Sequence, residues 1–305
     1  MNTDKTSRSA VLLGVAVGDA LGVPVEFKAR GSFRVTGMKG YGTHNQPPGT
    51  WSDDTSLTLA LADSLSHGCD MRDMARNFVR WYDEAAFTAH DEVFDIGGAT
   101  AKAIRRIKSG VAPERAGGTG ENENGNGSLM RIAPLVFYLT DKPQDERFQI
   151  TKAVSSVTHA HAWSVMACYI YLEILLKLLA GMEKKNAYAE VRDEFRSGHP
   201  AVGGDVLGRF ERILSADISA LPERDIRSGG FVIDTLEAAL WSFLTTDNYR
   251  DAVLQAVNLG GDTDTTAAVT GALAGLAYGL ASIPAQWLEQ VARHNAILRI
   301  AAAIP

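Results

Sequence analysis

The sequence is poor in cysteine and carries no excess of positive charge. Cys69 and Cys168 are the two cysteines among 305 residues, and no C-x-x-C motif occurs. This excludes a disulfide framework and a cysteine-based zinc site, and it fits a reducing compartment. The 30 Lys and Arg residues against 36 Asp and Glu residues give a formal net charge of −6 and a pI near 5.7. Nucleic-acid binding by bulk charge is therefore not expected, because it requires clustered Lys and Arg.

No apolar run predicts a membrane span. The run Ala10–Gly18 follows Lys5 and Arg8, as in a secretory signal, but Asp19 interrupts it and apolar residues continue beyond. The uncharged run Ala162–Leu172 is too short to cross about 30 Å of hydrocarbon. Apolar residues make up 46% of the chain and charged residues 22%, values typical of a globule with a sizeable core. We expect a soluble, cytoplasmic protein without a membrane partner.

Helical periodicity dominates the chain, and Phe33–Thr36 is the one short candidate strand. This pattern predicts an all-α fold. No Pro- or Ser-rich linker divides the sequence, so we expect one domain over residues 1–305. Helices are expected at Ser9–Leu21, Asp53–His67, Met71–Ala85, Ala99–Ser109, Ser128–Thr140, Gln144–Thr158, Trp163–Ala180, Ala187–Ser197, Asp205–Leu214, Gly230–Thr245, Tyr249–Leu259 and Thr265–Leu280, and after Pro284.

Glycines recur at a spacing of four on two of these expected helices. They are Gly14, Gly18 and Gly22 on the first, and Gly271, Gly275 and Gly279 on a late one. Each interior helical glycine costs roughly 0.8–1 kcal/mol relative to alanine, so the two stripes need a reason. A helix face without Cβ atoms allows another backbone to come close. We expect both helices to pack in the centre of the domain, with packing against each other as one arrangement.

Two short acidic segments, Ser52–Thr55 (SDDT) and Asp262–Thr265 (DTDT), lie where helices are expected to start. Helix capping would explain either one alone. Two such segments offer more oxygen atoms than caps require. Their carboxylates and hydroxyls, without thiolate or imidazole, form a ligand set that suits Mg²⁺ or Mn²⁺ better than zinc or copper. If the segments converge, only cations can neutralise them, because neither contains Lys or Arg.

Two stretches, Lys28–Thr50 and Ala116–Gly127, are irregular and rich in glycine. Each is either a flexible surface loop or the mobile rim of a ligand site, and composition favours the surface loop.

Six motifs occur in a fixed order along most of the chain. They are GDALGVPVE at Gly18–Glu26, SDDT at Ser52–Thr55, DIG at Asp95–Gly97, NGSLMR at Asn126–Arg131, TH at Thr158–His159 and GGDTDT at Gly260–Thr265. Together they resemble the ADP-ribosylglycohydrolase family, which includes the hydrolase acting on ADP-ribosyl dinitrogen reductase. The resemblance implies a compact orthogonal multi-helix bundle. It also implies two Mg²⁺ or Mn²⁺ ions and cleavage of the bond between ADP-ribose and an acceptor such as arginine.

The resemblance assigns roles residue by residue. The implied metal ligands are Ser52, Asp53, Asp54, Asp262, Asp264 and Thr265. The implied acid–base residues are Glu26 and Asp95. The implied substrate-binding residues are Asn126, Gly127, Ser128, Leu129, Met130 and His159. Physically, a glycine-rich turn leading into a helix N-terminus suits the diphosphate. The substrate is an ADP-ribosylated protein or small molecule, and an ADP-ribosylating toxin or transferase is the expected counterpart.

Several alternatives stay open at this stage. Without the roles that the resemblance implies, Glu26 would be a solvated loop carboxylate and Asp95 a helix cap. His159 would be a helix cap or a core residue, and Arg131 an ion-pair partner. No aromatic residue lies between Gly117 and Arg131, so adenine needs another support, such as a Tyr or Phe of Lys28–Thr50. The alternative functions are a non-catalytic ADP-ribose-binding or toxin-neutralising protein, and a metal-dependent hydrolase of another small substrate. The sequence does not identify the acceptor.

Overall fold

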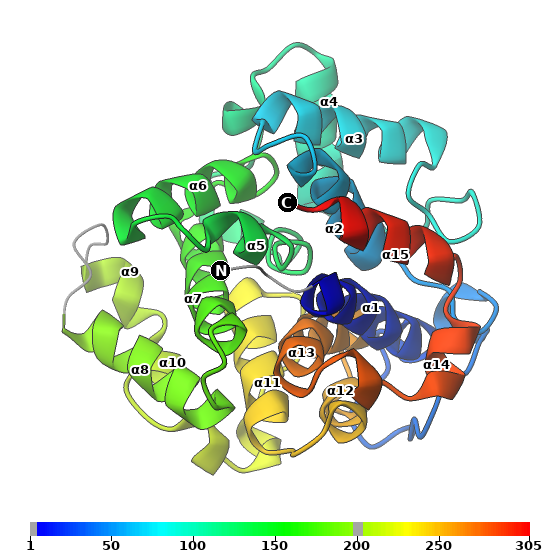
Figure 1. Cartoon of the computed structure of the whole chain (residues 1–305), viewed down its shortest axis with the longest axis vertical. Coiled ribbons are helices and arrows are strands. Elements are labelled where there is room, and N and C mark those ends of the chain that lie inside the picture. Colours follow the sequence, from blue (N-terminus) through cyan, green and yellow to red (C-terminus); the bar gives the residue numbers. More distant parts are fainter. Residues whose placement is uncertain (1–4, 198–203) are drawn as a thin grey trace.

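The computed structural model describes residues 5–197 and 204–305, and the part it describes is all-α (Figure 1). No strand occurs in these two ranges; isolated bridges such as Tyr41 with Gln46 are the nearest approach to a sheet. The predicted fold class is confirmed. The α-helices are α1 (Lys5–Gly22), α2 (Asp53–Leu65), α3 (Met71–Glu84), α4 (Gly98–Lys108), α5 (Leu135–Leu139), α6 (Gln144–Ser156), α7 (Ala162–Leu179), α8 (Lys184–Arg196), α9 (Gly204–Gly208), α10 (Glu211–Leu214), α11 (Val232–Leu244), α12 (Tyr249–Asn258), α13 (Thr263–Tyr278), α14 (Ala285–Gln290) and α15 (His294–Ala303).

The two glycine-bearing helices, α1 and α13, form the centre of the bundle and pack on each other, as expected (Figure 1). A Cβ on Gly14 would lie 2.3 Å from the Gly271 carbonyl oxygen, and one on Gly18 would lie 2.1 Å from that of Ala267. Both are far below van der Waals contact, so only glycine permits this approach. Gly279 does not take part, because it follows α13 with φ 81° and ends the helix.

Three predictions about local structure are wrong. The helix expected at Ser128–Thr140 is confined to α5, because Pro134 has no N–H and disfavours helical backbone before it, and turns replace the first part. The helix expected at Asp205–Leu214 is two short helices, α9 and α10. Phe33–Thr36 is no strand: the side chain of Asn258 pairs with the N–H and carbonyl of Val35 in place of a neighbouring strand.

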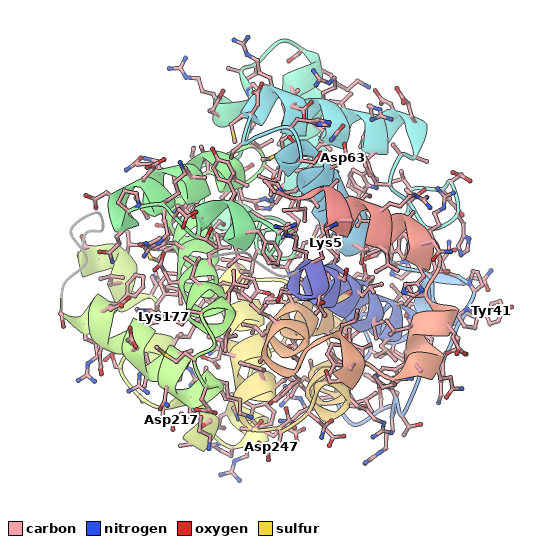
Figure 2. All side chains as sticks on the ribbon, viewed as in Figure 1. Lys5, Tyr41, Asp63, Lys177, Asp217 and Asp247 are labelled. Atoms are coloured by element: carbon pink, nitrogen blue, oxygen red, sulfur yellow. The ribbon has the colours of Figure 1, made fainter. Side chains whose placement is uncertain are left out.

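The apolar runs α1 and α7 are buried inside the fold. By length and composition, Lys5–Val25 and Ala162–Leu179 could each cross a membrane. In the structure every residue from Ala10 to Gly22 is buried, and α7 packs against α6, α8 and α11. Charged side chains such as Asp217 and Asp247 lie instead at the periphery (Figure 2). The core of the bundle therefore accounts for both runs.

Candidate active site

The two acidic segments converge. Ser52 caps α2 and Asp262 precedes α13, so the first turns of these helices carry the four aspartates. The Thr265 hydroxyl donates a hydrogen bond of 3.2 Å to Asp54 Oδ2, which joins the segments directly although 211 positions separate the two residues. The convergence that the sequence left conditional is therefore present.

The close packing of α1 against α13 brings the second segment to this place. A Cβ on Gly22 would lie 2.3 Å from the Cα atom of Asp264, and the Thr263 hydroxyl donates to the Gly22 carbonyl at 2.8 Å. The end of α1 therefore lies against the start of α13. The chain that continues from Gly22 reaches Glu26, which shares with Asp262 and Asp264 a group of oxygen atoms within 4.8 Å of one another.

Asp19, which the sequence showed as a break in an apolar run and as part of the motif GDALGVPVE but which was given no role there, organises the first acidic segment. Its fully buried carboxylate accepts hydrogen bonds from the N–H and hydroxyl groups of both Ser52 and Thr55, at 2.6–3.1 Å. Burial raises the pKa of Asp19 to about 6, although these hydrogen bonds oppose the rise. A lone aspartate within an apolar helix was the signal that could have identified it.

The converging carboxylates leave oxygen atoms without partners. Within the described residues, Asp54 Oδ1, Asp262 Oδ1 and Asp264 Oδ2 are buried and accept no hydrogen bond. Burial raises the pKa of Asp53, Asp54 and Asp264 well above the usual range, and neighbouring carboxylates raise it further. A divalent cation would reverse this shift by stabilising the ionised forms. The possible ligand atoms are all oxygens whose negative charge no cationic side chain of the described residues neutralises, and such a set fits Mg²⁺ or Mn²⁺.

A cavity of about 310 Å³ opens onto Asp53 and Asp262, one carboxylate of each acidic segment, whereas Ser52, Asp54 and Asp264 do not line it. No lysine or arginine lines it in the described part of the chain. Its walls combine both acidic segments, the loop before α4 and residues 125–129, named here the glycine segment. The lining residues are Glu26, Phe27, Asp53, Asp95, Ile96, Gly97, Gly98, Ala99, Thr100, Gly125, Asn126, Gly127, Met130, His159, Gly230, Asp262 and Thr265.

Glu26 and Asp95 both reach this cavity. Glu26 is only 4% exposed, so it is not a solvated loop carboxylate. Burial, followed by the charges of Asp95, Asp262 and Asp53, raises its pKa to about 10. Asp95 does not cap a helix, because α4 begins at Gly98 with Gly97 as its N-cap. Burial also raises the pKa of Asp95.

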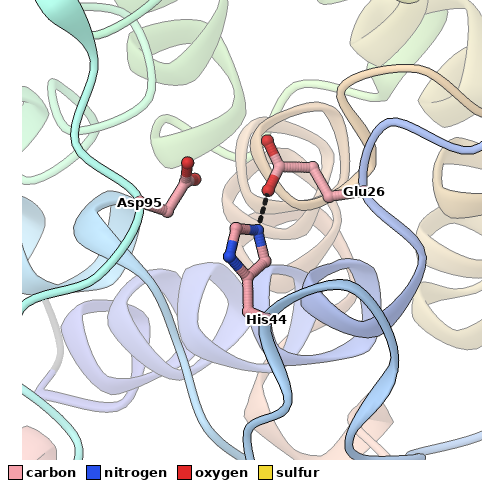
Figure 3. Close-up of side chains that lie close together, drawn as sticks. All are labelled: Glu26, His44 and Asp95. Carbon is pink, nitrogen blue, oxygen red and sulfur yellow. Dashed lines mark hydrogen bonds and ion pairs between the residues drawn. The ribbon is translucent and has the colours of Figure 1, made fainter.

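His44 joins these two carboxylates, and sequence analysis did not single it out. Its Nε2 atom hydrogen-bonds Glu26 Oε2, and the Asp95 carboxylate lies beside the pair (Figure 3). His44 comes from a 3-10 turn, Gly42–His44, inside the irregular stretch Lys28–Thr50. That stretch therefore contacts the site through His44, although none of its residues lines the cavity. A histidine within a loop of small residues gave no periodic or motif signal.

The glycine segment forms another wall, although not as a helix N-terminus. The N–H groups of Gly127, Ser128 and Leu129 donate to no group within residues 5–197 and 204–305. A Cβ on Gly127 would lie 2.8 Å from His159 Cε1, so glycine is required there. The Asn126 amide donates to Asp262 Oδ2 at 2.8 Å.

Of the remaining residues predicted to bind substrate, some line the cavity and others lie in the core. Met130 and His159 line the cavity, whereas the fully buried side chains of Ser128 and Leu129 do not. Burial and the charge of Arg131 lower the pKa of His159 to about 3, so its ring is neutral near pH 7. Arg131 is no ion-pair partner in the described structure: its guanidinium donates to the carbonyls of Gly127 and Val154 and thereby holds the glycine segment.

Comparison with known proteins yields one consistent family. The ADP-ribosylglycohydrolase family profile matches residues 1–305. The chain is 35% identical to an ADP-ribosylarginine hydrolase, Tri1, of Serratia proteamaculans, over 95% of this chain and 76% of that protein. It is 30% identical to the ADP-ribosyl-[dinitrogen reductase] glycohydrolase of Rhodospirillum rubrum, over 92% and 88% of the two chains. A solved ADP-ribosylglycohydrolase-related protein complex contains a chain with a TM-score of 0.83 and 35% identity, covering 98% of this chain and 97% of that one.

Proposed function

Because the chain belongs to the ADP-ribosylglycohydrolase family, it is a glycosidic-bond hydrolase, and we propose that it removes ADP-ribose from modified arginine side chains of proteins. One observation carries the proposal: two distant acidic segments meet at a cavity with buried, unpartnered carboxylate oxygens. Three buried carboxylates with unpartnered oxygens and no cationic side chain beside them would be very costly unless cations bound there.

We propose that the acidic segments hold two Mg²⁺ or Mn²⁺ ions. The ligands would be Ser52, Asp53 and Asp54 on one side and Asp262, Asp264 and Thr265 on the other. Bound cations of this kind orient ribose hydroxyls and acidify a water molecule. The Asn126 amide, donating to Asp262 Oδ2, keeps that carboxylate turned so that Oδ1 is free.

The nucleotide end of the substrate has a matching wall. The free N–H groups of residues 127–129 are suited to a diphosphate. Neutral His159 lies beside them and adds no charge. For adenine, Phe231 is an exposed aromatic residue beside these N–H groups: it pairs with Gly125 across an isolated bridge and is 38% exposed. Tyr41, from the loop first expected to hold the base, projects from the edge of the molecule (Figure 2).

Arginine as the acceptor is supported by the chemistry around Asp95. Phe27 and Asp95 both line the cavity and both approach His44, and Phe27 is 68% exposed. A carboxylate beside an exposed aromatic ring suits the planar, cationic guanidinium group. The names of the Serratia and Pseudomonas relatives specify the same linkage. An ADP-ribosylating toxin or transferase would supply the substrate, and the two free cysteines suit a cytoplasmic site of action.

Two carboxyl groups would move the protons. Cleavage at the anomeric carbon passes through a state with positive charge on the ribose ring, which the surrounding carboxylates stabilise. Glu26 lies within 4.8 Å of oxygen atoms of Asp262 and Asp264. With cations bound at these aspartates its pKa would fall, and the ionised Glu26 would take the proton from the attacking water. Asp95, on the acceptor side, would protonate the departing guanidine nitrogen.

The test is ADP-ribose release from arginine- and serine-linked ADP-ribosyl peptides, with Mg²⁺, Mn²⁺ or EDTA. We expect metal-dependent release from the arginine peptide and its loss in Asp264→Asn, whereas Asp247→Asn at the surface keeps full activity. Release from the serine peptide alone would contradict the acceptor. Tight ADP-ribose binding without release from either peptide would favour a binding or toxin-neutralising protein.

A further inference from the structure

A group of three side chains beside the oxygen-rich site includes a nitrogen ligand. Glu26, His44 and Asp95 come from three separate segments, and one ligand atom of each lies within 4.8 Å of the other two. Figure 3 shows the His44 ring directed at the two carboxylates, with its Nε2 atom on Glu26. Within the described residues, no lysine or arginine pairs with Glu26 or Asp95.

The imidazole is held in this position by its surroundings. The His44 ring contacts the rings of Phe27 and Phe94, with centroids 6.2 and 5.3 Å away. The neighbouring Thr43 hydroxyl donates to the Glu26 carbonyl at 2.8 Å, which ties the turn to the segment that carries Glu26. The group is therefore built into the wall of the site and does not depend on a chance approach of flexible side chains.

We propose that Glu26, His44 and Asp95 form a second metal site, selective for Zn²⁺ over Mg²⁺, whose occupation inhibits hydrolysis. Zn²⁺ accepts both imidazole nitrogen and carboxylate oxygen as ligands, and with three protein ligands it keeps a fourth position for water. Mg²⁺ prefers oxygen ligands alone and therefore remains at the aspartates. The ion would replace the hydrogen-bonded proton between His44 and Glu26, since zinc binds the neutral ring.

Inhibition follows because Glu26 belongs to two ligand groups. It lies with Asp262 and Asp264 on one side, and with His44 and Asp95 on the other. Zinc would hold Glu26 and Asp95 at once, and these are the two groups to which the proposed function gives the proton transfers. The inhibitory effect rests on that proposed function, whereas metal binding itself does not. A zinc-loaded enzyme should bind ADP-ribose and lose kcat.

The binding test uses Co²⁺ as a visible-absorbing substitute for Zn²⁺, added to the full chain in saturating Mg²⁺. We expect one equivalent of Co²⁺ to give intense visible bands, which zinc then displaces. His44→Gln and, separately, Asp95→Asn should abolish the bands. The matched control is His90→Gln, since His90 lies in the loop that carries Asp95 but outside the group of three, and hydrogen-bonds the Thr50 hydroxyl at 3.0 Å. Bands that survive both site variants, or no bands in the native protein, would overturn the site.

The inhibition test compares each variant with its own zinc-free rate. Loss of one ligand should raise the zinc concentration for half-inhibition in His44→Gln by roughly tenfold or more, with no change in His90→Gln. Equal inhibition of the native protein and His44→Gln would place zinc at the aspartates and refute the proposal. Cobalt binding by a protein that releases no ADP-ribose would instead refute the proposed function and leave the metal site intact.

Discussion

Replacing Gly22 by alanine should separate the two central helices at the point where the acidic site is assembled. Gly22 has φ −83° and ψ −38°, a conformation that alanine adopts freely, so the added Cβ is the whole perturbation. That atom would lie 2.3 Å from Cα and N of Asp264, whereas ordinary contact begins at 3.4 Å. The backbones must therefore move apart by about 1.1 Å (3.4 − 2.3).

This displacement has two consequences of different size. Alanine gains up to about 1 kcal/mol of helix propensity, and overpacking costs about 1–3 kcal/mol or more, so the net loss of unfolding free energy is about 0–2 kcal/mol or more. The loss of cation binding should be nearly complete, because Mg²⁺ tolerates ligand distances only within about 0.2 Å of their ideal values. A displacement of about 1.1 Å is about five times this tolerance, so the Asp264 carboxylate would no longer lie at a distance from which it can bind Mg²⁺.

Gly14→Ala is the matched control. Its Cβ meets the Gly271 carbonyl oxygen at the same 2.3 Å, but Gly14 lies about 12 Å further along the helix axis from the acidic site. Both variants should lower the denaturation midpoint in urea, and only Gly22→Ala should abolish Mg²⁺ binding by calorimetry together with ADP-ribose release. If the two variants bind Mg²⁺ equally well, the close approach at Gly22 does not set the geometry of the site.

Three further outcomes are expected. In EDTA, thermal stability should fall from pH 7 to pH 9, because Glu26, with its pKa near 10, keeps in the folded state a proton that the unfolded chain has lost. Adding Mg²⁺ should remove this fall, and a rise in Tm from pH 7 to pH 9 would contradict the prediction. Arg131→Met should cost about 1–3 kcal/mol in chemical denaturation, because it removes the donor to the Gly127 and Val154 carbonyls; unchanged stability would show that the guanidinium does not hold the glycine segment. Phe231→Ala should raise KM several-fold and leave kcat unchanged in steady-state kinetics, and an unaltered KM would remove Phe231 from the adenine site.

Local patterns in the sequence predicted most helices to within a few residues, because helix formation depends on periodic burial and on capping groups close in the chain. Ser52 before α2 is one example, since its side chain accepts from the N–H of Asp54. The predictions failed where a local signal was ambiguous. Pro134 confined one expected helix to α5, and the Asn258 side chain supplied Val35 with the partners that a strand would have given.

The sequence by itself determined the chemistry available to the protein: paired aspartates with hydroxyls, two glycine stripes and an order of motifs typical of one family. Only the tertiary structure decided which groups meet. Asp19 lies 33 positions from Ser52, and His44 lies 18 positions from Glu26. The packing of α1 on α2 and the path of the loop after Glu26 bring each pair into contact. Contacts between distant segments depend on how backbones pack, and a one-dimensional pattern does not contain that information.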